Sequence, residues 1–167
     1  NNTLSHIQVH NPKFIKDLNV QYRIPNSSGI QEALAEDSLI KVFTQRVILT
    51  GMISSANGVY AVRISGVDPE TETQVTTIHE KLLEGEYLTG IKRNPVVISQ
   101  RMAKKLNVKM RSKVVLTFQK DDGEIVAGAF RVSGIYKTIS SQADALNIYV
   151  KELMFTDCLG LKMNTTK

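Results

Sequence analysis

The sequence predicts an α+β protein in which a mixed sheet packs against several helices. Three observations predict this class: strand-like segments rich in β-branched residues, two hairpin signals at Asn57-Gly58 and Asp122-Gly123, and short segments with helical caps and helical periodicity. The chain has 167 residues, of which 42% are hydrophobic, so it can bury a core as one mid-sized domain or two small subdomains.

A strand and a helix are expected near the beginning of the chain. Residues 5–10 alternate polar side chains with the apolar residues Ile7 and Val9, which predicts a half-buried strand. Ser28 begins a capping-box pattern, and apolar residues recur at helical spacing after it. The pattern therefore predicts a helix over residues 28–37.

A long hairpin and a second helix are expected next. Residues 39–53 and 59–67 are rich in β-branched side chains and flank Asn57-Gly58, which predicts two antiparallel strands. Asp68-Pro69 supplies a capping residue followed by proline at the first helical position. Residues 70–83 are therefore expected to be partly helical.

Residues 94–118 are expected to form a strand, a helix and another strand. Within the helix, residues 100–106, apolar side chains fall on one face and the cations on the other. Asn107 directly follows and is suited to a left-handed helix cap. Asp122-Gly123 then predicts the turn of a second hairpin.

The return strand of that hairpin is expected over residues 125–138, with Gly128 and Gly134 as bulge positions. A last strand is expected over residues 145–150. An amphipathic helix is expected over residues 151–159, and it contains the only cysteine. One cysteine excludes an intrachain disulfide.

The net charge of +5 comes from one block of the chain. Between residues 92 and 113 there are eight cations and no Asp or Glu; the 21 cations less these eight leave 13 against 16 anions elsewhere. Such a block attracts an anionic lipid, a nucleic acid or an acidic partner surface, or it is simply a solvated face. The candidate basic patch consists of Arg101, Lys104, Lys105, Lys109 and Arg111.

The usual catalytic and metal-binding patterns are missing from the sequence. On a strand, His6 and His10 lie roughly 13 Å apart and cannot share a metal ion. His79-Glu80 begins an HExxH pattern, but Leu83 stands where the second histidine belongs. The chain contains no GxSxG, Walker A or GxGxxG pattern. We therefore expect no catalytic, cofactor-binding or metal-binding residues, and no cofactor.

Six segments, taken in their order along the chain, form a pattern that covers most of residues 5–150. They are HIQVHNPKF, ISGVDPETE, LLEGEYL, PVVISQRMAKKLNVKMRSKVVLTF, FRVSGIYKT and SQADALNIYV. Together they resemble the region between the first two membrane helices of FtsX/LolE/MacB-like ABC transporter permeases. The chain departs from the family pattern at Ser99, Asn107 and Ser112, where glycine is usual.

The resemblance implies a fold in two parts: a larger membrane-proximal (porter-like) α/β subdomain, residues 1–89 and 141–167, and a smaller helix-and-β (sabre-like) subdomain, residues 90–140. It also implies a domain on the periplasmic side of the bacterial inner membrane, as part of an integral membrane protein. The chain begins Asn1-Asn2 without an initiator methionine and has no apolar run long enough to span a bilayer, so an excised piece of a larger protein is expected.

The function implied by the resemblance is non-catalytic. A separate ABC ATPase would hydrolyse ATP and act through the membrane helices. The domain would relay this motion to a cargo (a lipoprotein, lipid, peptide or drug) or to a periplasmic or outer-membrane partner protein, in a dimer of permeases. Exposed hairpin tips are candidate partner contacts. They consist of Ser54, Ser55, Asn57, Gly58, Lys120, Asp121 and Asp122.

An alternative from another class is a basic soluble module that binds a nucleic acid or an anionic surface through the helix at residues 100–106. Residues 92–113 contain no Phe, Tyr, Trp or His on which bases could stack. Nucleic acid is therefore not the expected partner, although contacts with a phosphate backbone remain open.

Overall fold

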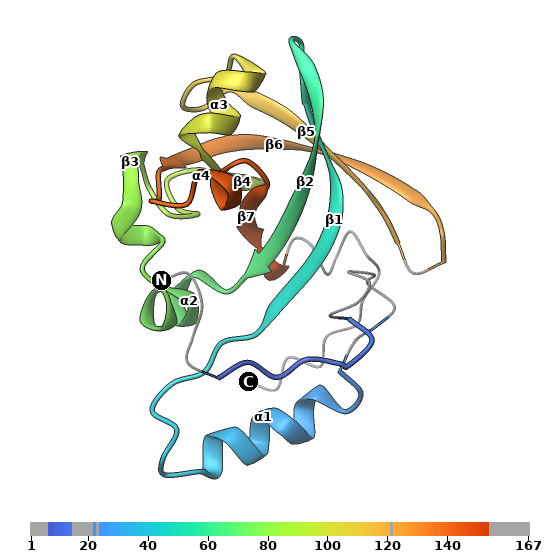
Figure 1. Ribbon diagram of the computed structural model, residues 1–167, viewed down its shortest axis with the longest axis vertical. Coiled ribbons are helices and arrows are strands. Elements are labelled where there is room, and N and C mark those ends of the chain that lie inside the picture. The colour runs from blue at the N-terminus through green and yellow to red at the C-terminus, as the bar shows by residue number, and fades with distance from the viewer. Residues whose placement is uncertain (1–6, 15–21, 23, 121, 154–167) are drawn as a thin grey trace.

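Seven strands form one mixed sheet among the residues described by the computed structural model, which are all except 1–6, 15–21, 23, 121 and 154–167 (Figure 1). The strands are β1 (Arg46–Ser55), β2 (Gly58–Val67), β3 (Leu82–Gly85), β4 (Pro95–Ser99), β5 (Lys113–Gln119), β6 (Ile125–Tyr136) and β7 (Asn147–Lys151). The helices are α1 (Ser27–Glu36), α2 (Pro69–Val75), the 3₁₀ helix η1 (His79–Lys81), α3 (Gln100–Leu106) and α4 (Ser141–Asp144). The predicted α+β class is confirmed.

The sheet closes on itself. Its order is β3-β6-β4-β7-β2-β1-β5, and β5 also pairs with β6, so the six described strands other than β3 form a ring. The long strand β6 makes this closure possible, because its first half pairs with β5 and its second half with β4. The pairs β2–β7 and β4–β6 are parallel and the others antiparallel.

Apolar side chains are buried on both sides of the sheet. The larger core fills the ring, and α3 closes one end of it with Met102, Ala103 and Leu106. A smaller core lies on the outer side, where Val67, Tyr136 and Tyr149 pack with Ile78, which directly precedes η1, and with Tyr87 and Leu88. Among the described residues, the outer side is therefore covered over only part of the sheet.

Local signals account for the helices and turns that were predicted well. Helix α3 has the expected bounds: the Ser99 side chain caps its start, and Asn107 ends it with a φ of 50°. Asp68 caps α2 by accepting a hydrogen bond from the Glu70 amide. The Asp122-Gly123 turn is also present, with Gly123 at a φ of 86°, a conformation that glycine adopts without strain.

Two strand predictions are wrong in extent. In the strand predicted over residues 5–10, residues 5 and 6 lie outside the described residues. Residues 7–10 are not in a strand, and Ile7 is 81% exposed. The strand expected from residue 39 begins only at Arg46, which pairs with Val67 at the end of β2. Beyond Val67 the chain turns into α2, so β2 offers no partner to residues 39–45.

The turns and helix ends differ from the expectation in detail. The first hairpin is confirmed, but its two loop residues are Ala56 and Asn57, since Ser55 pairs with Gly58. The helix at residues 27–36 is confirmed, but its cap residue is Asn26, which makes no side-chain capping bond. The helix expected over residues 70–83 ends at Val75, and η1 and β3 follow it.

The last part of the chain matches the expectation more closely. Strand β6 is confirmed, and its pairing with β4 skips Ser133, next to Gly134. Gly128 is not a bulge, because the β5–β6 register is unbroken there. The last strand is confirmed as β7. Most of the helix expected over residues 151–159 lies outside the described residues.

The division into residues 90–140 and the remainder stays a prediction. Strands β4, β5 and β6 fall in the smaller part, and they pair with β7, β1 and β3 of the larger part. The core inside the ring also contains residues from both parts. Among the described residues the sheet is thus continuous across both predicted boundaries.

Candidate functional site: two hairpin tips, a basic helix and a buried ion pair

The tip of the β1–β2 hairpin is held against the end of α3. The Ser55 hydroxyl donates a hydrogen bond of 2.8 Å to the Leu106 carbonyl, and the Asn57 amide group donates to the same oxygen at 3.4 Å. The Leu106 carbonyl lies in the last turn of α3, where backbone acceptors have no partner within the helix. The two polar side chains at the tip therefore link the hairpin to the helix.

An aromatic contact strengthens this link. The Lys105 ammonium group lies 5.2 Å from the centre of the Tyr60 ring, and the Tyr60 hydroxyl donates to the Lys105 carbonyl at 3.4 Å. A cation over an aromatic face is worth about 0.5–1 kcal/mol at an exposed site. The structure thus brings together two candidate sets, the first hairpin tip and the basic helix.

The tip of the β5–β6 hairpin lies apart from this assembly and points away from α3 (Figure 1). Lys120 forms ion pairs with Asp122 and Glu124, and the hydrogen bond from Lys120 to Glu124 raises the pKa of the ammonium group. Asp121 is outside the described residues. The described charges of this tip are paired with one another.

The cations of α3 lie on its exposed face, as predicted. Arg101 and Lys104 line a surface pocket of about 300 Å³ together with Lys137 from the end of β6. Asp144 also lines it, but its carboxylate accepts hydrogen bonds from the Thr138 amide at 2.9 Å and hydroxyl at 2.7 Å. Lys137 is far from the basic block in the sequence, so no local pattern could have grouped it with α3.

The remaining basic candidates lie outside this pocket. Lys109 and Arg111 are exposed in the turn between α3 and β5, where Arg111 has a φ of 65°. The Arg111 amide donates to the Val132 carbonyl at 2.8 Å, and its carbonyl accepts from Arg131 at 3.2 Å. The basic block of the sequence is therefore divided between α3 and a turn packed on β6.

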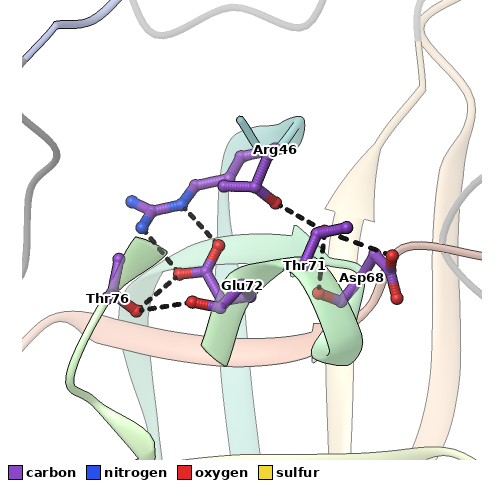
Figure 2. A network of polar contacts seen from close by, with 6 residues as sticks. Arg46, Asp68, Thr71, Glu72 and Thr76 are labelled. Carbon is purple, nitrogen blue, oxygen red and sulfur yellow. Dashed lines mark hydrogen bonds and ion pairs between the residues drawn. The ribbon is translucent and has the colours of Figure 1, made fainter. Parts of the chain in front are cut away.

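An ion pair between a partly buried arginine and a buried glutamate, which no sequence pattern predicted, connects β1 to α2 (Figure 2). Arg46 binds the Glu72 carboxylate through two hydrogen bonds, from Nε at 3.0 Å and from a terminal nitrogen at 2.6 Å. The Glu72 side chain is fully buried, and the Thr76 hydroxyl donates to it at 3.1 Å. Nearby, the hydroxyls of Thr44 and Thr71 are 2.9 Å apart. Neither charge lies in a recognisable motif, so only the fold reveals the pair.

Buried tyrosines lie beside this ion pair. Tyr149 packs against Tyr87 and Tyr136, with ring centres 6.3 Å and 5.7 Å away. Burial raises the pKa of Tyr149 to about 12 and that of the other two further. All three stay protonated near neutral pH, so this cluster supplies no base.

Glu152 follows β7, and its carboxyl pKa is raised to about 7, first by burial and then by the charge of Asp68. The folded protein therefore binds this proton more tightly than the unfolded chain does. Binding of this proton by Glu152 stabilises the folded protein. The stabilisation is greatest below the ordinary glutamate pKa and is lost as the pH rises through about 7.

We expect Glu152→Gln to raise the melting temperature more at pH 8 than at pH 5, because glutamine removes the cost of a partly buried carboxylate. Thermal unfolding at the two pH values measures this difference. Glu84→Gln, at an exposed position of β3, is the control. A shift from Glu152→Gln that is the same at both pH values would contradict the assignment.

Two further features concern metal binding and membrane crossing. Among the described residues, no group of three or more His, Cys, Asp or Glu side chains is placed to hold a metal ion. No helix in the described part of the chain is long and apolar enough to cross a membrane.

The fold of this chain is similar to that of known proteins. The chain has the fold of the extracytoplasmic domain of an ABC-type transporter permease, and the resemblance seen in the sequence is confirmed at the level of the fold. No protein-family model matches the chain, and no curated protein matches it in sequence.

Two solved structures carry this assignment. One is the extracellular domain of the noncanonic ABC-type transporter YknZ from Gram-positive bacteria, with a TM-score of 0.57 and 17% identity over 77% of this chain. The other is a domain assigned to a permease protein of Porphyromonas gingivalis, with a TM-score of 0.51 and 17% identity over 83% of this chain. The chain spans 64% and 56% of the lengths of these two structures.

Proposed function

We propose that this chain is a non-catalytic extracytoplasmic domain of an ABC transporter permease. The observation that carries the proposal is the shared fold, which covers 77% of the chain in the YknZ comparison. The ordered segments that resemble FtsX/LolE/MacB-like permeases support it independently. The domain would stand on the periplasmic side of the bacterial inner membrane, and a separate ABC ATPase would supply the energy.

The proposed task of the domain is to relay motion from the membrane helices to a cargo or a partner protein. A relay requires segments that move together, and two sets of described contacts support the proposal. The β1–β2 tip is tied to α3, while the other end of the same hairpin is tied to α2 by Arg46 and Glu72. A push on α2 would therefore reach α3 through one continuous hairpin. We also propose that the cargo is a lipoprotein, a lipid, a peptide or a drug, and that two permeases form a dimer.

The location can be tested by cysteine labelling of the full-length protein in its host. In a Cys158→Ser background, Ile139→Cys places a thiol at a fully exposed position, and Ile64→Cys places one at a fully buried position as the matched control. We expect a membrane-impermeant maleimide to label residue 139 in cells whose inner membrane is intact, and to leave residue 64 unlabelled. Labelling of residue 139 only after the inner membrane is broken would contradict the proposal.

A further inference from the structure

Within the part of the chain that the structure describes, the outer side of the sheet is covered in one region and bare in another. Strand β2 pairs with β1 without a bulge, so its alternate residues Val59, Ala61 and Val67 point to the same side. Val67 is fully buried in the outer core. Val59 and Ala61, near the hairpin tip, are exposed, and Val59 is 59% exposed. The covering of the outer side thus ends partway along this strand.

The bare region carries two rows of uncharged side chains across four neighbouring strands. The strand registers define the first row as Ala61, Met52, Thr117 and Ala127. They define the second row as Val59, Ser54, Val115 and Ala129. We call these two rows the uncharged face. An outward sheet face in water is usually polar, so small and apolar residues at adjacent exposed or half-buried positions mark a contact surface.

Charges of one sign border the uncharged face. On β2, Arg63 is the next outward-facing residue beyond the first row. On β5 and β6, Lys113 and Arg131 pair with each other and are the next outward-facing residues beyond the second row. All three side chains are exposed. The sequences of these four strands contain no Asp or Glu. The described acids near the β5–β6 tip, Asp122 and Glu124, are paired with Lys120.

A second copy of the chain is a poor occupant of this surface. The cations that border the face would find no carboxylate on the same four strands of a second copy, so two copies packed face to face would lack charge complementarity. The rows are also small: four strands about 4.8 Å apart give a block roughly 15 Å wide. A stable interface covers about 800 Å² on each partner, so the block can form only the core of a larger contact.

We propose that the uncharged face is the core of a docking surface for a different protein, one that presents apolar side chains flanked by carboxylates. Charge complementarity supplies the argument, because carboxylates at the margin of the partner would meet Arg63 at one end and Lys113 and Arg131 at the other. The inference concerns the fold itself and does not require the proposed location. It overlaps the hairpin-tip prediction only at Ser54, because Ser55 and Asn57 at the first tip already bond to α3.

The test is photocrosslinking in the full-length protein, in its own host. A benzoylphenylalanine at Thr117, in the middle of the first row, should form an adduct with one non-self polypeptide. The same group at Gln74, an exposed position of α2, is the positional control and should not give this adduct. Mass spectrometry of the adduct should place the crosslink in a peptide with apolar residues next to Asp or Glu.

The charges are tested by a matched pair of reversals in the Thr117 background. We expect Lys113→Glu to lower the adduct yield about tenfold, because it reverses a rim charge. Lys81→Glu makes the same change of charge at an exposed position of η1 and should leave the yield within about twofold. Reversing an acid in the crosslinked partner peptide to lysine should restore the yield with Lys113→Glu. Thermal unfolding establishes that both variants remain folded.

Several outcomes would overturn the inference. They are an adduct with a second copy of the chain, an adduct with lipid only, no intermolecular adduct, and equal losses from Lys113→Glu and Lys81→Glu. Each of these results can occur while the maleimide still labels Ile139→Cys from outside the membrane. Failure of the docking surface is therefore distinguishable from failure of the proposed location.

Discussion

Replacing Arg46 with alanine is expected to lower the free energy of unfolding by about 3–5 kcal/mol. The Glu72 carboxylate would then remain fully buried, with the Thr76 hydroxyl as a side-chain donor but no cation beside it. An uncompensated buried charge costs far more than the loss of a surface ion pair, which is worth about 0–1 kcal/mol. Urea unfolding followed by circular dichroism measures the change.

The control for this prediction is Arg63→Ala, which removes an exposed arginine from the neighbouring strand and should change stability by less than about 0.5 kcal/mol. The double replacement Arg46→Met with Glu72→Met removes both charges. It should recover much of the loss, since a buried ion pair is often no more stabilising than apolar residues of similar volume. A cost below about 1 kcal/mol for Arg46→Ala would show that the pair is not buried as described.

Leu116→Ala is expected to cost about 2–5 kcal/mol, because it removes a fully buried side chain from the core inside the ring. Leu116 pairs with Ile53 on β1 and with Gly128 on β6, at the place where β5 closes the ring. The cavity would thus open at the junction of three strands. Urea unfolding measures the cost.

The matched control is the adjacent residue of the same strand. Val115 points to the outer side as part of the uncharged face and is only partly buried. Val115→Ala should therefore cost much less than Leu116→Ala. Equal costs would mean that the two sides of β5 have been assigned wrongly, and the uncharged face would then lose its basis.

Features that depend on neighbouring residues were predicted from the sequence, whereas features that depend on distant residues were not. The helix at residues 100–106 was predicted with the correct bounds, because its apolar face and Asn107 lie within one short segment. The first hairpin was also found from neighbouring residues, although its loop is Ala56-Asn57 and not Asn57-Gly58. Residues 39–45 were wrongly predicted as strand, because β-branched composition does not show whether a neighbouring strand is present to pair with them.

The candidate site shows the same division. The exposed cations of α3 followed from helical periodicity, and the exposed hairpin tips followed from turn signals. The contact between Ser55 and the end of α3 joins residues 51 positions apart. The grouping of Lys137 with Arg101 likewise depends on the packing of β6 beside α3. No local pattern encodes either contact.

The sequence by itself determined the class of the protein, most of its helices and turns, the absence of familiar catalytic motifs and the resemblance to permease domains. Only the tertiary structure decided that the strands close into a ring, that Arg46 and Glu72 share a buried site, and that part of the outer sheet is bare and uncharged. The physical reason is that caps, turns and periodicity act between near neighbours along the chain. Ring closure, burial and the composition of a surface depend on which distant strands lie side by side.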